Sequence, residues 1–135
     1  MNNNVLMMMA MAGMLVINVE AYASEVELLQ SEYQNQGAEP FSAAAGEKMW
    51  GQQYIDKKSG KQRSCQTCHG EDLTMSGKHA RTGKVIDPLA RSVNSERLTK
   101  VKFMKKWLKR NCKWTIGREC SAQEKGDFLA YLKGL

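Results

Sequence analysis

The chain has 135 residues, of which 25% are charged and 42% hydrophobic, and its formal net charge is +6. This length suits one domain and is too short for most multi-domain enzymes with a large internal pocket. The charged fraction excludes a protein with many membrane spans, and no repeat period indicates a solenoid.

The N-terminus has the pattern of a cleaved signal peptide. Residues 5–19 are mainly apolar, but the run is shorter than the ~20 residues that a spanning helix needs. Residues 21–23 (Ala-Tyr-Ala) form a small-x-small cleavage site. No Lys or Arg precedes the apolar run, so an uncleaved membrane anchor is the alternative. We expect a signal peptide over residues 1–23, one domain over 24–135, and a periplasmic location.

An exported protein meets different partners from a cytoplasmic one. Despite the basic balance, we expect no nucleic acid partner and favour an acidic protein. All four cysteines lie in the expected mature domain, in a compartment where disulfides form.

The periodicity of the mature chain predicts an all-α fold. A helix is expected near residues 26–34, and a second over 43–54 with Ser42 as its N-cap. Residues 57–63 are polar and contain glycine, which indicates a loop.

The second half of the chain begins with an irregular segment. Residues 70–99 show little periodicity, which is unusual in a compact domain unless a large cofactor orders them. Residues 100–110 predict an amphipathic helix, and 121–132 a last helix that opens with a capping box. The apolar face of the amphipathic helix consists of Val101, Met104, Trp107 and Leu108.

One local motif carries the chemistry. Cys65, Cys68 and His69 form C-x-x-C-H, the signature of c-type haem attachment. Two cysteines three residues apart can each add to one haem vinyl group, and the adjacent histidine then ligates the iron. We therefore expect one covalently attached haem c.

The cysteines have two other interpretations. A thioredoxin-like redox pair lacks a flanking βαβ pattern. A zinc site would need Cys112 and Cys120, whose separation by seven residues is unusual for a zinc knuckle.

The sixth iron ligand decides between an electron carrier and a ligand-binding iron. Met49, Met75, Met104 and His79 are the candidates by residue type. Met49 lies on a core helix, Met75 follows His69 closely, Met104 shares an apolar face, and His79 lies in a polar loop. The residues alone leave the distal ligand open.

The surroundings of the motif resemble class I cytochromes c. Gly46 and Trp50 lie four residues apart on the helix before the motif, and residues 127–132 give the last helix an aromatic and aliphatic face. In that family the first and last core helices cross at such positions.

A closer resemblance is to the sphaeroides haem protein (SHP) family. It covers about residues 43–132, in specific order and spacing. The matching segments are His79 to Lys84, Pro88 to Ala90, Ser92 to Asn94, Lys109 to Cys112, Gly117 to Cys120, and Gln123 to Asp127.

The resemblance implies a high-spin haem with an asparagine as distal ligand, which leaves the iron when O₂, NO or cyanide binds. Carried over by motif, the ligand is Asn111, and a Cys112–Cys120 disulfide lies beside it. It also implies electron delivery from a dihaem cytochrome c and a membrane cytochrome b. From the residues alone, Asn111 equally suits a helix C-cap, and Asn94 is the rival asparagine.

The disulfide would close a loop of nine residues, for which chain entropy gives about 2.5 kcal/mol. It either fixes the loop that carries Trp114 or positions Asn111. Redox activity of this bond has no support in the sequence.

Cations surround the expected haem edge. We expect Arg81 and Lys84 to pair with the haem propionates. The basic run over residues 100–110 is either a solvated helix face or a docking patch for an acidic redox partner.

We expect a periplasmic monohaem cytochrome whose Asn111 is displaced by O₂ or NO and which takes part in electron transfer. The alternative is an ordinary His/Met or bis-His electron carrier. Reduction of O₂ or NO, or peroxidase-like chemistry, would need an acid/base pair, and His79 is the one spare histidine. Whether the protein is an enzyme is left open.

Overall fold

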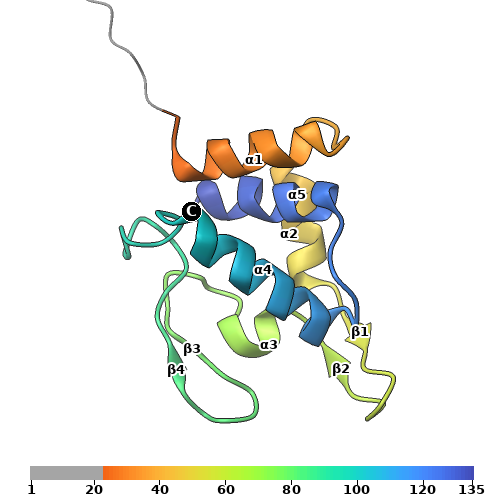
Figure 1. The fold of residues 1–135 in the computed structure, drawn as a ribbon. Helices are drawn as coiled ribbons and strands as arrows, with labels where there is room; N and C mark the ends of the chain where they lie inside the picture. Colours follow the sequence, from red (N-terminus) through yellow and green to blue (C-terminus); the bar gives the residue numbers. More distant parts are fainter. Residues whose placement is uncertain (1–22) are drawn as a thin grey trace, which may run out of the picture.

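The computed structural model describes residues 23–135, so the expected signal peptide lies outside the described residues except for Ala23. In this part of the chain, five helices pack together to form the core, and two small hairpins lie at its edge (Figure 1). Within this described part of the chain, no helix is long and apolar enough to cross a membrane.

Helix α1 (Glu25–Asn35) confirms the first expected helix. Ser24 caps it through a capping box with Glu27, in which side chains and backbone amides bond reciprocally. Its buried side chains are Val26, Leu29 and Tyr33, and they join Met104 and Leu129 in one apolar cluster.

Helix α2 (Ala43–Gly51) begins after Ser42 as expected but ends three residues before the predicted end at residue 54. Gln52 has extended backbone, and the chain then enters strand β1 (Tyr54–Ile55), which pairs antiparallel with β2 (Gln62–Arg63). The exposed Gln52 and Gln53 add nothing to the apolar face of the helix. The backbone after Gly51 therefore leaves the predicted helix, and Tyr54 pairs in a strand instead.

The expected irregular segment is confirmed in most of its length. After the short helix α3 (Gln66–His69), the chain forms only strands β3 (Gly77–Lys78) and β4 (Val85–Ile86) before residue 100. Gly77 packs so closely on the Cys68 carbonyl that a Cβ there would overlap it. The hairpin is thus seated directly on the C-x-x-C-H turn.

Helix α4 (Val101–Thr115) is longer than the predicted 100–110. It ends where Ile116 donates its backbone N–H to Cys112 and Gly117 adopts a positive φ of 84°. Asn111 therefore lies inside the helix and is not a C-cap, and Trp114 is helical rather than part of a loop. Helix α5 (Ala122–Lys133) and its capping box of Ser121 and Glu124 are confirmed.

Helices α2 and α5 make the most extensive helix contact in the described chain. At Gly46 the two backbones approach so closely that a Cβ would overlap the carbonyl of Asp127 and come within 2.9 Å of the Tyr131 Cβ. Asp127 also accepts the backbone N–H of Ser42 at 2.8 Å, which fixes the start of α2 against α5. This crossing is the one expected from class I cytochromes c.

Replacing Gly46 with Ala should lower the melting temperature. Overpacking costs about 1–3 kcal/mol, which outweighs the ~1 kcal/mol that Ala gains over Gly in a helix. Gly51→Ala in the same helix is the control, because the nearest atom there is a Gln66 side-chain atom at 3.5 Å. Equal melting temperatures for the two variants would contradict the close approach.

Candidate haem site

The C-x-x-C-H motif occupies a single helical turn. Cys65 is the N-cap of α3, and the His69 amide donates to the Cys65 carbonyl at 3.1 Å. The Ser64 amide donates to Thr67 Oγ1 at 2.9 Å, which holds the start of the turn. Cys65 and Cys68 are both free thiols and partly buried. One turn therefore presents two thiols and an imidazole together.

His69 lies in an apolar environment that suits a neutral metal ligand. Its ring centroid is 5.4 Å from that of Trp50. Burial, and secondarily the charge of Arg97, lowers the pKa of His69 to about 4. The imidazole is neutral at pH 7, which is the form that ligates metals.

Two buried polar atoms at this point have no hydrogen-bond partner, Trp50 Nε1 and His69 Nδ1. Buried polar groups are almost always paired in native proteins. Trp50 Nε1 and His69 Nδ1 therefore need hydrogen-bond partners that the described residues do not supply.

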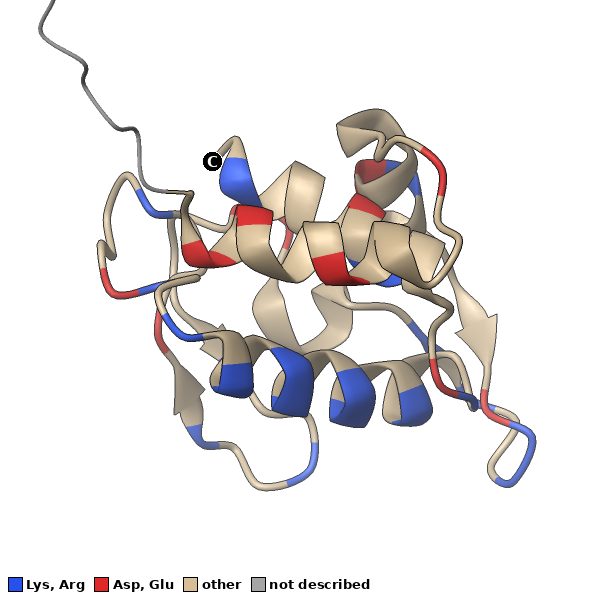
Figure 2. Cartoon of the chain, turned by 45° about the horizontal axis from the view of Figure 1, so that its top comes forward, with Lys and Arg blue, Asp and Glu red and all other residues tan. Residues whose placement is uncertain are grey.

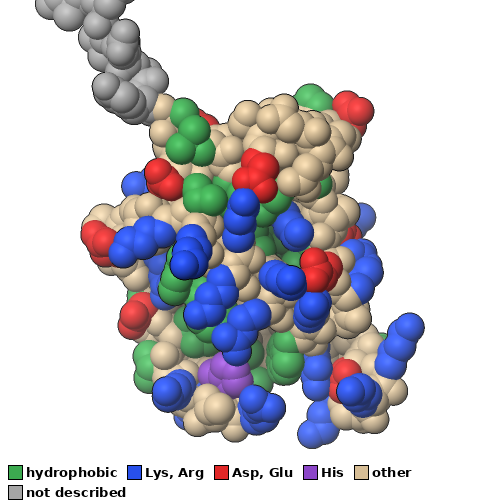
Figure 3. Space-filling view, in the orientation of Figure 1, with side chains coloured by type: hydrophobic (Ala, Val, Ile, Leu, Met, Phe, Trp, Pro, Cys, Tyr) green, Lys and Arg blue, Asp and Glu red, His purple; other side chains and the backbone are tan. Residues whose placement is uncertain are grey.

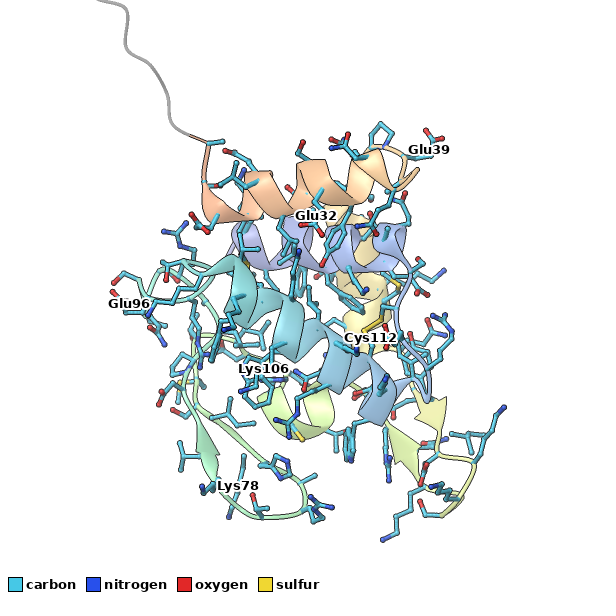
Figure 4. All side chains as sticks on the ribbon, viewed as in Figure 1. Glu32, Glu39, Lys78, Glu96, Lys106 and Cys112 are labelled. Atoms are coloured by element: carbon cyan, nitrogen blue, oxygen red, sulfur yellow. A yellow bond between two sulfur atoms is a disulfide. The ribbon has the colours of Figure 1, made fainter. Side chains whose placement is uncertain are left out.

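The setting of the thiols does not favour a zinc or redox centre. Burial raises the pKa of Cys65 to about 12, so it is a neutral thiol rather than a thiolate. Cys112 forms a disulfide with Cys120 (Figure 4). Neither of these two sulfurs therefore joins Cys65 and Cys68, which are free thiols. Residues 23–135 contain no group of three His, Cys, Asp or Glu side chains that could hold a bare metal ion.

Helix α4 presents an aromatic stripe that leads to Asn111. Phe103, Trp107 and Asn111 recur at i, i+4 and i+8, so they share one face. The Phe103 and Trp107 rings meet edge to face at 5.9 Å, yet remain 49% and 38% exposed. Met104 and Trp107 lie on the same side of α4, three residues apart, but only Met104 is buried, so the predicted apolar face is covered at Met104 and open at Trp107.

Further apolar side chains reach the surface in the irregular segment. Met75, Val85 and Val93 are all more than half exposed. Figure 3 shows apolar side chains between the basic ones on the lower half of this face, around a histidine. Aromatic and aliphatic side chains that lack an apolar partner fit a large flat apolar group such as a haem.

The alternative iron ligands lie in four different settings. Met104 is 6% exposed in the apolar cluster under α1, and Met75 is 63% exposed. Met49 packs against the cluster around Trp50. His79 uses Nδ1 to accept the backbone amides of Arg81 and Thr82 at 3.3 and 3.2 Å, so it shapes the β3–β4 turn.

The two asparagines have different environments. Asn94 donates its side-chain amide to the Pro88 carbonyl at 3.1 Å. Asn111 has no such bond among the described residues, lies half-buried on the aromatic stripe, and precedes the buried Cys112. Asn111 is thus the asparagine with a free amide beside the apolar face.

The cations near the site divide into two groups. Arg81 and Lys84 are exposed on the β3–β4 turn. Arg97 is half-buried and lines a pocket of about 360 Å³ with Asn94, Phe103 and Met104. It donates Nε to the Pro88 carbonyl at 2.8 Å and Nη2 to the Asp87 carbonyl at 2.7 Å. Sequence reasoning missed Arg97 because nothing in the irregular segment distinguishes it from its basic neighbours.

Comparisons with known proteins agree with this geometry. Residues 36–132 match the family model described as Domain of unknown function (DUF1924). Over 69 residues the chain is 52% identical to Cytochrome c-type protein SHP of Cereibacter sphaeroides, covering 51% of this chain and 53% of that protein. It is 39% identical over 74 residues to cytochrome c'' of Methylophilus methylotrophus, covering 55% of this chain and 51% of that protein. These alignments thus span about half the length of the curated relatives.

The solved structures cover more of the chain. Oxidized SHP, described as an oxygen binding cytochrome c, superposes with a TM-score of 0.72 and 38% identity, covering 81% of this chain and 96% of that one. The chain belongs to the SHP family of c-type cytochromes. Oxidized cytochrome c'' gives a TM-score of 0.70 at 32% identity, covering 80% of this chain and 92% of that one.

Membership of the SHP family confirms the expected all-α cytochrome c fold and the covalently bound haem c. The residues present fit this group, since the motif turn offers the thiols and a neutral imidazole. Cys65 and Cys68 would hold the haem through thioethers, and His69 would ligate the iron from one side.

Removing both thiols should abolish covalent attachment. Cys65→Ala with Cys68→Ala should yield a chain whose intact mass lacks the haem, because thioethers are the covalent links. The parent protein and a Cys112→Ser, Cys120→Ser variant should retain the haem mass under denaturing conditions. Loss of the haem mass from the Cys112/Cys120 variant alone would contradict the assignment.

Proposed function

We propose that this cytochrome binds small diatomic molecules such as O₂ or NO at its haem and takes part in periplasmic electron transfer. The observation that carries this proposal is Asn111, a half-buried asparagine on the aromatic stripe of α4. The likeness to an oxygen binding cytochrome c supports it.

The chemistry of an asparagine ligand suits reversible displacement. When bound, the haem supplies an iron whose sixth position decides between electron transfer and ligand binding. A side-chain amide oxygen is neutral and is a weaker ligand than imidazole or thioether. Asn111 would therefore yield the position to a diatomic molecule, and its NH₂ group would be a donor for a hydrogen bond to that molecule.

A disulfide would hold helix α4, and nearby cations would hold the haem propionates. The Cys112–Cys120 disulfide would tie the residue after Asn111 to the start of α5. Arg81 and Lys84 on the β3–β4 turn would pair with propionates, and Arg97 in the nearby pocket is a third cation for this role.

An acidic cytochrome is the proposed electron donor, in line with the dihaem cytochrome c and membrane cytochrome b that the family implies. Helix α4 contains a row of Lys and Arg residues and no acidic residue (Figure 2). Among the described residues, Lys105, Lys109 and Lys113 pair with Glu32 or Glu119, whereas Lys102, Lys106 and Arg110 pair with no acid. Lys106 and Arg110 lie over the Trp107 ring at 5.5 and 5.1 Å, so this basic face adjoins the aromatic stripe.

Substituting Asn111 should change ligand binding. Asn111→Ala removes the competing ligand, so CO should bind to the ferrous protein at least about tenfold faster, which corresponds to losing ~1.4 kcal/mol of ligation. Stopped-flow mixing with CO measures this rate. Asn94→Ala is the control and should leave it unchanged. A parent protein that ignores CO would contradict the proposal.

The docking proposal predicts a salt-sensitive reduction rate. With an acidic dihaem cytochrome c as donor, the rate should fall steeply between low and physiological ionic strength, because steering between opposite charges is screened. Lys106→Gln with Arg110→Gln should slow reduction at low salt, whereas Lys57→Gln with Lys58→Gln on the β1–β2 turn should not. A flat salt response would rule out this surface.

A further inference from the structure

One side chain links the haem-attachment segment directly to the last turn of α4. Arg63 lies two residues before Cys65, on β2, and its side chain is 23% exposed. Its guanidinium sits 4.4 Å from the centroid of the Trp114 ring, and Nη1 donates to the Trp114 carbonyl at 3.0 Å. We call this pair the Arg63–Trp114 clamp.

The second terminal nitrogen of the Arg63 guanidinium, Nη2, is bound within the β1–β2 hairpin. Arg63 Nη2 forms an ion pair with Asp56 Oδ2 at 3.0 Å. Hydrogen bonding from Ser59, together with the charge of Arg63, lowers the pKa of Asp56, so the carboxylate is ionised at neutral pH. The Asp56 amide also donates to the Lys61 carbonyl at 2.9 Å. The planar guanidinium is thus fixed from both sides and presents a rigid surface to Trp114.

Trp114 lies next to Asn111 on α4, so the clamp acts close to the proposed iron ligand. Trp114 lies three residues after Asn111, so the two side chains are neighbours on one helix. On the same turn of α4, the Cys112–Cys120 disulfide joins the helix to the start of α5. The clamp instead joins it to β2 and, two residues on, to the thiol that would hold the haem.

We propose that the Arg63–Trp114 clamp positions Asn111 relative to the haem and so sets how easily a diatomic ligand replaces it. This inference rests on the proposed function, because Arg63 acts through Asn111 and touches neither the haem nor its ligand. Without the clamp, the last turn of α4 moves more freely, and Asn111 holds its position less well.

The test is a double-mutant cycle on the holoprotein. Arg63→Gln should speed CO binding about three- to tenfold, as expected from losing a partly buried cation–π contact and a charged hydrogen bond. In an Asn111→Ala background the same substitution should change the rate less than about twofold, because only contacts through Asn111 are coupled.

A second measurement does not depend on iron chemistry. Hydrogen exchange at the backbone amides of residues 111–115 should be faster in Arg63→Gln than in the parent. Arg63→Lys, which keeps the charge but loses the fork that reaches Asp56 and Trp114 together, should fall between them. Lys133→Gln removes an ion pair with Glu27 on the far side of the fold and serves as the control without effect.

The outcomes distinguish the role of the clamp from the proposal that Asn111 is the distal ligand. Faster CO binding in Asn111→Ala with no change in Arg63→Gln overturns the clamp alone. An equal effect of Arg63→Gln in both backgrounds also overturns it, because Arg63 would then act independently of Asn111. An Asn111→Ala variant that binds CO at the parent rate overturns the distal ligand and, with it, this inference.

Discussion

The crossing of α2 and α5 is the constraint on which the rest of the structure depends. It exists because Gly46 has no Cβ, so the Asp127 carbonyl can lie against its Cα. The same crossing brings Trp50 against Phe128 and Tyr131, with ring centroids 6.1 and 6.0 Å apart. Trp50 in turn lies on His69. One small residue thus determines where the imidazole of the haem motif stands relative to the core.

Different faces of helix α4 pack into the core, carry the aromatic stripe and present the basic side chains. Its inner strip, which includes Met104 and Cys112, belongs to the two apolar clusters, and Leu108 packs against both. On the stripe, Phe103 and Trp107 stay exposed and Asn111 is half-buried. The outer face carries the lysines. A single helix can therefore be anchored in the core, offer a weak ligand to a cofactor and present positive charge to a partner.

The extent of prediction from sequence follows from the range of the interactions. The C-x-x-C-H motif, the capping box at Ser121 and the irregular segment after the motif depend on local chemistry, and local patterns predicted all three. The capping box at Ser24 is equally local but was not predicted. The end of α2 was missed because cross-strand pairing of Tyr54 with Arg63 replaced the helix. The contacts of Arg97 and the exposure of Trp107 depend on how distant segments pack, which periodicity does not encode. Asn111 came from family resemblance alone.

The central claim is that Asn111 is the displaceable sixth ligand of a haem whose fifth ligand is His69. A crystal structure of the holoprotein, solved in the ferric state and again in the ferrous state with CO, tests it most directly. We expect the Asn111 side-chain oxygen on the iron in the ferric structure and turned away from it in the CO complex, with α4 otherwise in place. Methionine or histidine on the iron in both states would contradict it.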